Sequence, residues 1–278
     1  MVLKKLYSLR KSHTDGKSQM TLQVLKSAFG KIFQVCQNEG LFQEELGYEC
    51  IDHGEIQGKT VDVSLELMIR SQKDSLWPIH ESIDHYNEED VFDVIEFLHD
   101  KASFPTKGWH HDYMECGWHY TEFDAAKGKA RFRNHVNGLL AHYLNGYRLN
   151  EEGEIEELPE TGLGSLLDAR LPPKSENIEN QVNSAIRKYR LRSSTFEDRK
   201  DAVRELADAF EFIRPKLKKV MVKNDEMALF DLLNNFSIRH HNHKQKTNYD
   251  QAIWHSWMFY FFLATIHAAM REIEKKSN

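Results

Sequence analysis

The stretch Leu171-Pro172-Pro173-Lys174 divides the sequence into two parts of different pattern. Two consecutive prolines cannot continue a helix or a central strand, so a boundary between domains is expected here. The sequence therefore predicts an N-terminal domain over residues 1–172 and a C-terminal domain over residues 173–278.

The part that follows this stretch reads as helical throughout. Thr195 followed by Asp198 predicts a capping box at the start of one of these helices. Helices are predicted over residues 178–192, 195–212, 225–238 and 251–274. Four helices of these lengths predict a compact bundle.

The part that precedes it mixes helices with turns. Residues 21–39 carry apolar side chains at three- and four-residue steps, which predicts a helix. Asn87 and Asp124 are good N-caps for two further helices. Short runs at 147–149 and 154–156 on either side of turn residues predict a hairpin. The predicted fold class is mainly α, with an α-rich N-terminal domain that contains this small β-hairpin and a C-terminal four-helix bundle.

Two N-terminal segments have no single interpretation from pattern alone. Residues 47–58 contain several glycines and mixed polarity, which indicates irregular chain or a short strand. Residues 63–69 fit either a strand or a helix.

Composition restricts the class of protein. The chain has 278 residues, a formal net charge of −6 and 40% apolar residues. The apolar segment over residues 252–270 is interrupted by His255, Ser256 and His267, so a core helix is expected rather than a membrane span. The N-terminus lacks the apolar stretch of a secretory signal. A cytoplasmic protein without a membrane partner is predicted.

The number and spacing of the cysteines also restrict the class of protein. Cys36, Cys50 and Cys116 are far apart and form no C-x-x-C pair, so neither a zinc knuckle nor a disulfide scaffold is expected. A low, odd number of cysteines is typical of a reducing compartment. No metal site and no cofactor are predicted. The sequence also lacks a phosphate-binding loop, a nucleophile elbow and an H-E-x-x-H zinc helix.

The most unusual segment lies between the last two predicted helices, where three histidines, an arginine and an asparagine gather over residues 239–243. If the helix continues briefly, Arg239 and His243 fall on one face. An arginine offers a planar fork for phosphate, and a histidine can move a proton near neutral pH. Such a pair could cleave RNA without a metal. The histidine would take the proton of the ribose 2′-hydroxyl, which attacks the adjacent phosphorus, and the arginine would stabilise the negative charge that grows on the phosphate oxygens.

Two other interpretations of this segment stay open. The imidazoles of His240, His241 and His243 could bind a metal, although a regular helix cannot point all three the same way. The segment could also be a solvated polar loop with a structural role. A basic run over residues 174–223 likewise fits a solvated helix surface or a face for a polyanion.

An aromatic and histidine-rich segment precedes the third N-terminal helix. It contains Trp109, His110, His111, Tyr113, Trp118, His119 and Tyr120. The segment is predicted to be a loop whose rings close the core of the small domain, with their polar tips bonded at its edge. Stacking on nucleobases is the alternative. The aromatic residues of the last helix are likewise expected in the core first, with a dimer face as a second role.

The Arg239 and His243 pair at the junction of the last two bundle helices resembles the HEPN superfamily, many of whose members are ribonucleases. The pattern there is an arginine, four to six residues and a histidine, often with a polar residue after the arginine. Here three residues separate the pair, and His240 holds the polar position. The resemblance implies that Arg239 binds phosphate, that His243 or His240 acts as general base, that Asn242 orients them, and that two copies form a homodimer.

The N-terminal part resembles the N-terminal domains of AbiJ-type abortive-infection proteins over residues 40–160. The resemblance is carried by residues 91–100 with Pro105, 116–120, Phe132-Arg133 with Asn137, and 146–149 with 153–155. It implies a sensor or interaction half joined to an effector half in a bacterial antiphage protein. RNA as substrate is expected from the HEPN resemblance, and a phage-derived trigger is the expected signal. The alternative is a non-catalytic HEPN-like binding or regulatory module in a defence system.

Overall fold

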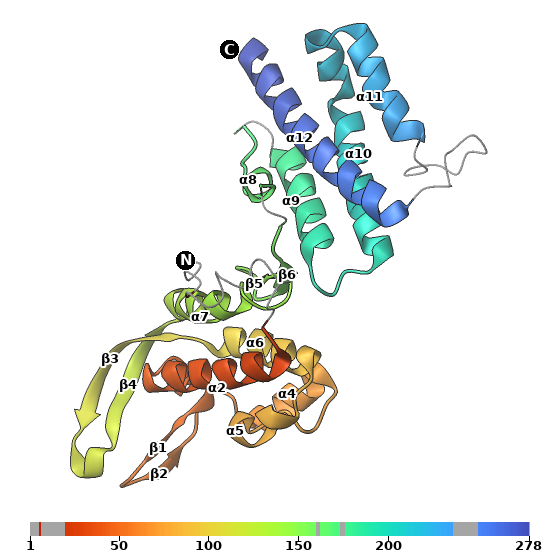
Figure 1. The fold of residues 1–278 in the computed structure, drawn as a ribbon. Helices are drawn as coiled ribbons and strands as arrows, with labels where there is room; N and C mark the ends of the chain where they lie inside the picture. The colour runs from red at the N-terminus through yellow and green to blue at the C-terminus, as the bar shows by residue number, and fades with distance from the viewer. Residues whose placement is uncertain (1–5, 7–19, 160–161, 173–175, 236–249, 278) are drawn as a thin grey trace. The chain divides into compact units, whose positions relative to one another are not determined.

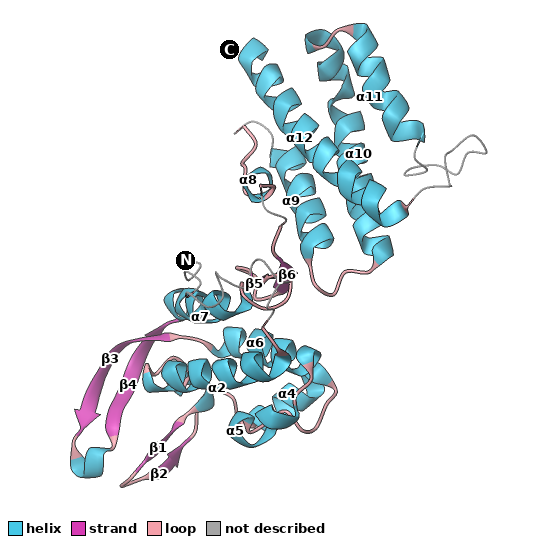
Figure 2. Ribbon diagram, in the orientation of Figure 1, coloured by secondary structure: helices cyan, strands magenta, loops and turns pink. Residues whose placement is uncertain are grey.

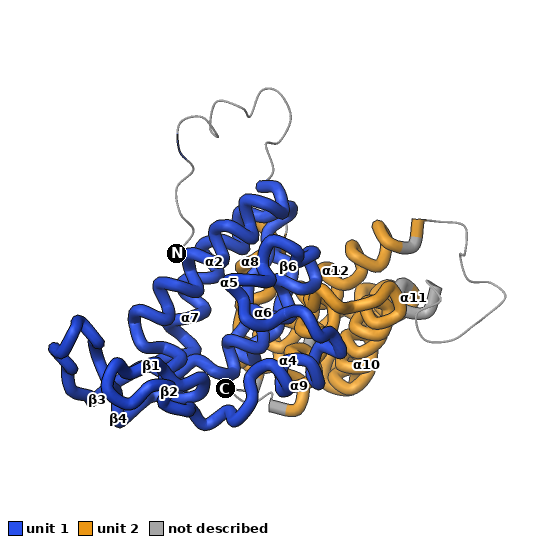
Figure 3. The backbone as a smooth tube through the Cα atoms, turned by 90° about the horizontal axis from the view of Figure 1, so that it is seen from below, with its two compact units in different colours: residues 1–158 blue, residues 159–278 orange. Residues whose placement is uncertain are grey.

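The structure is a computed structural model of the chain, which describes residues 6, 20–159, 162–172, 176–235 and 250–277. The chain forms two compact units, Met1–Leu158 and Pro159–Asn278, which are coloured separately in Figure 3. The division falls upstream of the Leu171–Lys174 stretch that marks the predicted boundary.

The fold is mainly helical, as the sequence predicts, with small antiparallel hairpins in the N-terminal unit (Figures 1 and 2). The helices of this unit are α2 (Leu22–Asn38), α3 (Gln43–Leu46), α4 (Val63–Ser71), α5 (Ile79–Ser82), α6 (Glu88–Lys101) and α7 (Ala125–Leu140), with the 3₁₀ turns η2 (Ile83–His85) and η3 (Tyr113–Glu115). The paired strands are β1 (Tyr48–Cys50) with β2 (Gly54–Ile56), β3 (Phe104–His111) with β4 (Gly117–Asp124), and β5 (Tyr147–Leu149) with β6 (Ile155–Glu157).

Helices begin where the sequence supplies a cap. Asn87 accepts from the backbone N–H of Asp90 at 2.9 Å, and the Asp90 carboxylate accepts from the N–H of Asn87 at 2.8 Å, which completes a capping box at the start of α6. Asp124 caps α7, and Thr21 caps α2. The sequence predicts the caps at Asn87 and Asp124, because capping depends on residues close together in the chain, whereas it predicts α2 from apolar periodicity.

The observed hairpins confirm one prediction for the N-terminal unit and correct another. The predicted hairpin at 147–149 and 154–156 is confirmed as β5–β6, with its second strand one residue later. Residues 47–58 contain the hairpin β1–β2, and residues 63–69 belong to helix α4. The prediction of an aromatic loop over residues 108–120 was wrong, because most of that segment forms the long hairpin β3–β4.

The core of the N-terminal unit lies between α2, α6 and α7. Phe29 from α2, Phe97 from α6 and Phe132 from α7 are each at most 2% exposed. Together with the aliphatic residues of the same three helices they form one continuous apolar cluster. The hairpins β1–β2 and β3–β4 extend from this core, as Figure 1 shows.

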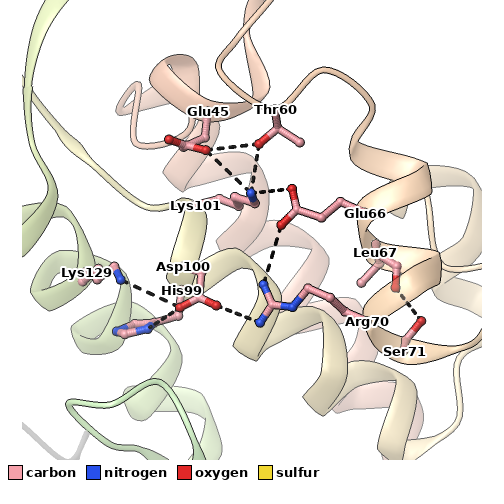
Figure 4. A network of polar contacts seen from close by, with 10 residues as sticks. All are labelled: Glu45, Thr60, Glu66, Leu67, Arg70, Ser71, His99, Asp100, Lys101 and Lys129. Atoms are coloured by element: carbon pink, nitrogen blue, oxygen red, sulfur yellow. Dashed lines mark hydrogen bonds and ion pairs between the residues drawn. The ribbon is translucent and has the colours of Figure 1, made fainter.

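Polar contacts join the short helices around this core (Figure 4). The buried ammonium of Lys101 donates to Glu66 at 2.7 Å and to Thr60 at 2.9 Å, and lies 3.6 Å from Glu45. Lys101 lies at the end of α6, Glu66 in α4 and Glu45 in α3. One cation therefore links three separate helices.

The C-terminal unit contains α8 (Gly164–Leu167), α9 (Glu176–Arg190), α10 (Phe196–Val220), α11 (Lys223–Asn235) and α12 (Gln251–Ser277). Helix α10 packs along both α9 and α12, and α11 contacts α10. The inner face of α10 is lined with alanine and aliphatic side chains. Its Phe210 packs against Phe262 of α12, with ring centroids 6.1 Å apart. The predicted bundle of long helices is confirmed among the described residues.

The capping box predicted at Thr195 and Asp198 is also present, at the start of α10. Over the residues that the structure describes, no helix combines the length and the apolar character needed to cross a membrane. The segment 252–270 lies within α12, where Phe259 and Phe262 are buried in the bundle. It is a core helix, as the sequence predicts, but Trp254 and Trp257 near its start are 39% and 40% exposed, so the prediction that these two residues lie in the core was wrong.

Candidate metal centre

The residues predicted to carry catalysis, Arg239, His240, Asn242 and His243, lie outside the residues that the structure describes. They belong to the stretch between the end of α11 at Asn235 and the start of α12 at Gln251. Their proposed roles in phosphate binding and proton transfer therefore stay predictions. A different candidate site lies in the N-terminal unit.

Four side chains with metal-ligating atoms meet where β1–β2 and β3–β4 come together. They are Cys50, His111, Cys116 and His119, and one ligand atom from each lies within 4.8 Å of the other three. Two thiolates and two imidazoles form a set that binds Zn²⁺ in tetrahedral structural sites.

The register of the long hairpin aligns its two histidines. Trp109 pairs with His119, and His111 pairs with Gly117. Because successive side chains of a strand alternate between faces, His111 shares the face of Trp109 and therefore that of His119. The two imidazole centroids lie 5.3 Å apart. The neighbouring His110 belongs to the opposite face, so only one of the two consecutive histidines reaches the cluster.

The turn between β3 and β4 returns Cys116 to His119. Met114 at φ 48°, Glu115 at φ 59° and Gly117 at φ 100° all have left-handed backbone around this turn. Glycine adopts that conformation without steric cost, which suits it to the position directly after Cys116. The Cys116 Sγ lies 3.2 Å from the His119 Nε2 as a result.

Cys50 brings the fourth ligand from the other hairpin. It is the last residue of β1, is 1% exposed, and has its Sγ 3.9 Å from the His111 Nδ1. The next residue, Ile51, donates its backbone N–H to the Cys116 Sγ at 3.5 Å. Such a donor stabilises negative charge on sulfur, so the first hairpin both supplies one thiol and supports the other.

Asp52 determines which nitrogen of His111 faces the cluster. Its carboxylate lies 3.1 Å from the His111 Nε2. An imidazole N–H that donates to Asp52 leaves Nδ1 as the free lone pair, and Nδ1 is the atom that faces Cys50. Histidines that bind metals commonly donate their other N–H to a carboxylate in this way.

The electrostatics of His119 also suit a ligand. Its side chain is 4% exposed, and burial lowers its pKa, followed by the effect of the neighbouring imidazoles of His111, His53 and His110. A lowered pKa keeps the ring neutral, which is the form that donates a lone pair to a metal. Burial first, and then Cys50 and Cys116, raise the pKa of the adjacent Tyr48 hydroxyl.

The size of the cluster matches one metal ion. Zinc–sulfur and zinc–nitrogen bonds of about 2.3 and 2.0 Å place tetrahedral ligands about 3.3–3.8 Å apart. Two sulfur–nitrogen separations, 3.2 Å between Cys116 and His119 and 3.9 Å between Cys50 and His111, lie close to this range, and all four ligand atoms lie within 4.8 Å of one another. Four protein ligands leave no open position for substrate, so the set fits a structural rather than a catalytic metal.

The surrounding aromatic residues do not lie where the sequence analysis expects them. Trp109 and Trp118 are each 50% exposed and Tyr113 is 58% exposed, so the prediction that they close the domain core was wrong. The Trp109 ring instead packs against the His119 ring, with centroids 4.5 Å apart. Trp118 stacks on Tyr120 on the other face of the hairpin.

The absence of a C-x-x-C pair predicts no zinc site, and the cluster therefore corrects that expectation with single cysteines from two separate hairpins. The local signal that could have found half of it is the Cys116-x-x-His119 spacing, which is typical of one arm of a zinc site. Cys50 and His111 have no such local signal, because they are separated from each other by 61 residues.

Comparison with known proteins adds no assignment. No family model, no curated protein and no solved structure matches this chain.

Proposed function

We propose that the N-terminal unit is a zinc-binding module in which one Zn²⁺ ion, held by Cys50, His111, Cys116 and His119, joins the hairpins β1–β2 and β3–β4. The observation that carries this proposal is the convergence of four ligand atoms within 4.8 Å of one another from two separate hairpins.

Ligand chemistry favours zinc over other metals. Thiolate and imidazole together exclude the hard cations Mg²⁺ and Ca²⁺, which take oxygen ligands. A tetrahedral set of two sulfurs and two nitrogens is typical of Zn²⁺. The carboxylate of Asp52 then serves as the outer partner of His111 rather than as a fifth ligand.

The role we propose for the ion is structural. Each strand of β1–β2 has three residues, and an isolated two-stranded hairpin is marginally stable in water. The hairpins β1–β2 and β3–β4 belong to separate two-stranded sheets, so backbone hydrogen bonds do not join them into one sheet. A metal with ligands from both would fix their relative position and hold the exposed aromatic residues of β3–β4 in place.

Metal analysis of the purified full-length protein tests this proposal. We expect about one zinc per chain, and X-ray absorption distances of about 2.3 Å for sulfur and 2.0 Å for nitrogen. Substitution with Co²⁺ should give the intense visible absorption of a tetrahedral site and a thiolate charge-transfer band. Cys116→Ser should remove the charge-transfer intensity of one thiolate and reduce the zinc content.

Two variants serve as matched controls. Cys36→Ala removes the third cysteine, which is buried in α2 outside the cluster and whose thiol pKa is raised to about 12, chiefly by burial. His110→Gln removes the histidine beside His111 on the opposite face. Both should keep full zinc content. Zinc loss in these controls that equals the loss in Cys116→Ser would refute the proposed ligand set.

For the C-terminal unit we propose, as a second candidate function, metal-independent RNA cleavage by Arg239 and His243 in a bacterial antiphage protein. Its support is the arginine and histidine chemistry of residues 239–243, their position in sequence between the last two helices of a helical unit, and the resemblance to HEPN and AbiJ-type proteins. His240 is the alternative base and Asn242 the orienting residue, in a homodimer with RNA as substrate.

RNA incubated with the protein and EDTA should yield products with 2′,3′-cyclic phosphate ends. Arg239→Ala and His243→Ala should each abolish them. Because EDTA also removes a structural zinc, Cys116→Ser should be assayed in parallel, and its activity without EDTA shows whether cleavage needs the N-terminal metal. Cleavage that survives both C-terminal substitutions would exclude this site, and no cleavage under any trigger would favour the non-catalytic binding module.

A further inference from the structure

One end of the C-terminal unit contains a cavity that neither proposal uses. Its volume is about 230 Å³, and it is lined by Tyr189, Ser194, Phe196, Arg199, Ala252 and His255. These residues come from the end of α9, the turn that follows it, the first turn of α10 and the start of α12. Three helices of the bundle therefore contribute to one small site.

The walls of the cavity are aromatic. Phe196 stacks on His255 with ring centroids 5.1 Å apart and an interplanar angle of 27°. Tyr189 lies almost parallel to Phe259 of the core, which fixes the orientation of its ring. Phe196, the first residue of α10, is 41% exposed, so part of its ring is open to solvent. A fixed, partly exposed aromatic surface suits a planar ligand.

Charges of both signs lie around the cavity, since Lys200 pairs with Glu197 at 3.3 Å and Arg204 pairs with Asp201. Arg199 lines it, with its guanidinium carbon 5.9 Å from the Tyr189 ring centroid. Lys200 and Arg204 lower the pKa of His255 through their charge, after the larger effect of burial, and Glu197 opposes them. An arginine beside a small cavity is well suited to a phosphate, because its planar fork donates two parallel hydrogen bonds.

The buried imidazole of His255 independently indicates that the cavity holds a ligand. It is 5% exposed and lines the cavity, and its Nδ1 has no hydrogen-bond partner among the residues that the structure describes. Buried polar atoms are normally paired, and the exceptions call for an explanation. A ligand that brings a hydrogen-bonding group into the cavity would provide one.

We propose that this cavity binds a nucleoside monophosphate group, with the base against Phe196 and the phosphate at Arg199 and the Ser194 hydroxyl. The volume is below the roughly 300–1,000 Å³ of sites for drug-sized ligands, which suits one nucleotide rather than a longer segment. The same chemistry could come from a free nucleotide or from one residue of an RNA chain. The proposal depends neither on the zinc centre nor on Arg239.

Calorimetric titration of the full-length protein tests it. Adenosine 5′-monophosphate should bind saturably, and adenosine and inorganic phosphate should each bind at least about tenfold more weakly, because each lacks one half of the recognised group. A short 2′-O-methyl RNA, which resists cleavage through the 2′-hydroxyl, distinguishes the sources. Tighter binding of the RNA identifies an RNA subsite, and tighter binding of the mononucleotide identifies a nucleotide site.

Three variants locate the binding. Arg199→Gln and Phe196→Ala should each weaken it about tenfold, and both residues are only partly buried, so the fold should tolerate the changes. His255→Asn should also weaken it, because the Nδ1 atom that the ligand is proposed to pair with is lost. Lys218→Gln removes the same charge from an exposed position near the far end of α10 and should have little effect.

Several results would overturn the proposal. These are the absence of saturable binding, equal weakening by Lys218→Gln and Arg199→Gln, and binding of adenosine as tight as that of the monophosphate. Circular dichroism of each variant separates lost binding from lost structure. The zinc content and the RNA cleavage activity are measured separately, so failure here is distinguishable from failure of the functions proposed above.

Discussion

Different interactions stabilise the interiors of the two units of this protein. The N-terminal unit is built from short elements, of which the longest helix has 17 residues, and it is connected by buried polar groups and by the candidate metal centre. The C-terminal unit is built from helices of up to 27 residues that pack through aliphatic and aromatic side chains.

The two units also differ in net charge. Residues 1–158 contain 17 lysines and arginines against 27 aspartates and glutamates, whereas residues 159–278 contain 20 against 16. An acidic unit with short elements gains from cations placed between its helices, such as Lys101. Long helices bury apolar surface along their whole length, and ion pairs such as Arg214 with Glu226 at 2.7 Å also join them.

The largest expected effect comes from removal of the metal. Structural zinc contributes on the order of 10 kcal/mol of binding free energy in small modules, so a chelator should greatly accelerate amide hydrogen exchange in β1, β3 and β4. Exchange in α10 and α12 should stay unchanged. Mass spectrometry of peptides from both units measures this, and equal acceleration in the two units would contradict a local metal.

The next effect concerns Lys101. Lys101→Met should lower the free energy of unfolding by about 3 kcal/mol, because it leaves Glu66 and Glu45 without their shared cation in a partly buried place. Lys107→Met is the matched control, since Lys107 forms a solvent-exposed pair with Glu122 at 2.8 Å and should cost less than about 1 kcal/mol. Urea unfolding compares the two, and equal losses would contradict the importance of burial.

A third prediction concerns pH. Burial first, and then the charges of Lys129 and Arg133, lower the pKa of His99 to about 4, against the opposing effect of Asp100. The unfolded chain, with a histidine pKa of about 6.5, then binds a proton that the folded chain does not bind. Stability from this residue is therefore present above about pH 6.5 and falls by about 2 kcal/mol as the pH is lowered to about 5.

Urea unfolding at both pH values measures this loss. His99→Gln should reduce the dependence by the same amount, and the exposed control His80→Gln should leave it unchanged. An unaltered pH dependence in His99→Gln would show that other groups carry it.

The smallest effect compares helix caps in the two units. Thr195→Ala should cost about 1 kcal/mol, because its hydroxyl accepts from the N–H of Asp198 at 3.2 Å within a reciprocal capping box. Thr21→Ala should cost about 0.5 kcal/mol, because its contact with the Val24 N–H is longer, at 3.4 Å, and has no reciprocal partner. Thermal unfolding measures both, and the reverse order would mean that cap geometry does not control the cost.

The sequence by itself determined the features that depend on neighbours in the chain. Asn87, Asp124 and Thr195 mark helix starts because a cap needs only the next three residues. The long helices of the C-terminal unit follow from apolar periodicity, and the hairpin β5–β6 follows from its turn. For the candidate metal centre, the sequence contains only the Cys116-x-x-His119 half as a local pattern.

The tertiary structure decided the rest. Whether His110 or His111 faces the cluster depends on the register of β3 with β4, because a shift of one residue exchanges the two faces of a strand. Cys50 reaches the same point only because a second hairpin lies beside the first. Ligands from distant segments come together through the packing of the whole unit, and their separation along the sequence does not predict that they lie close together in space.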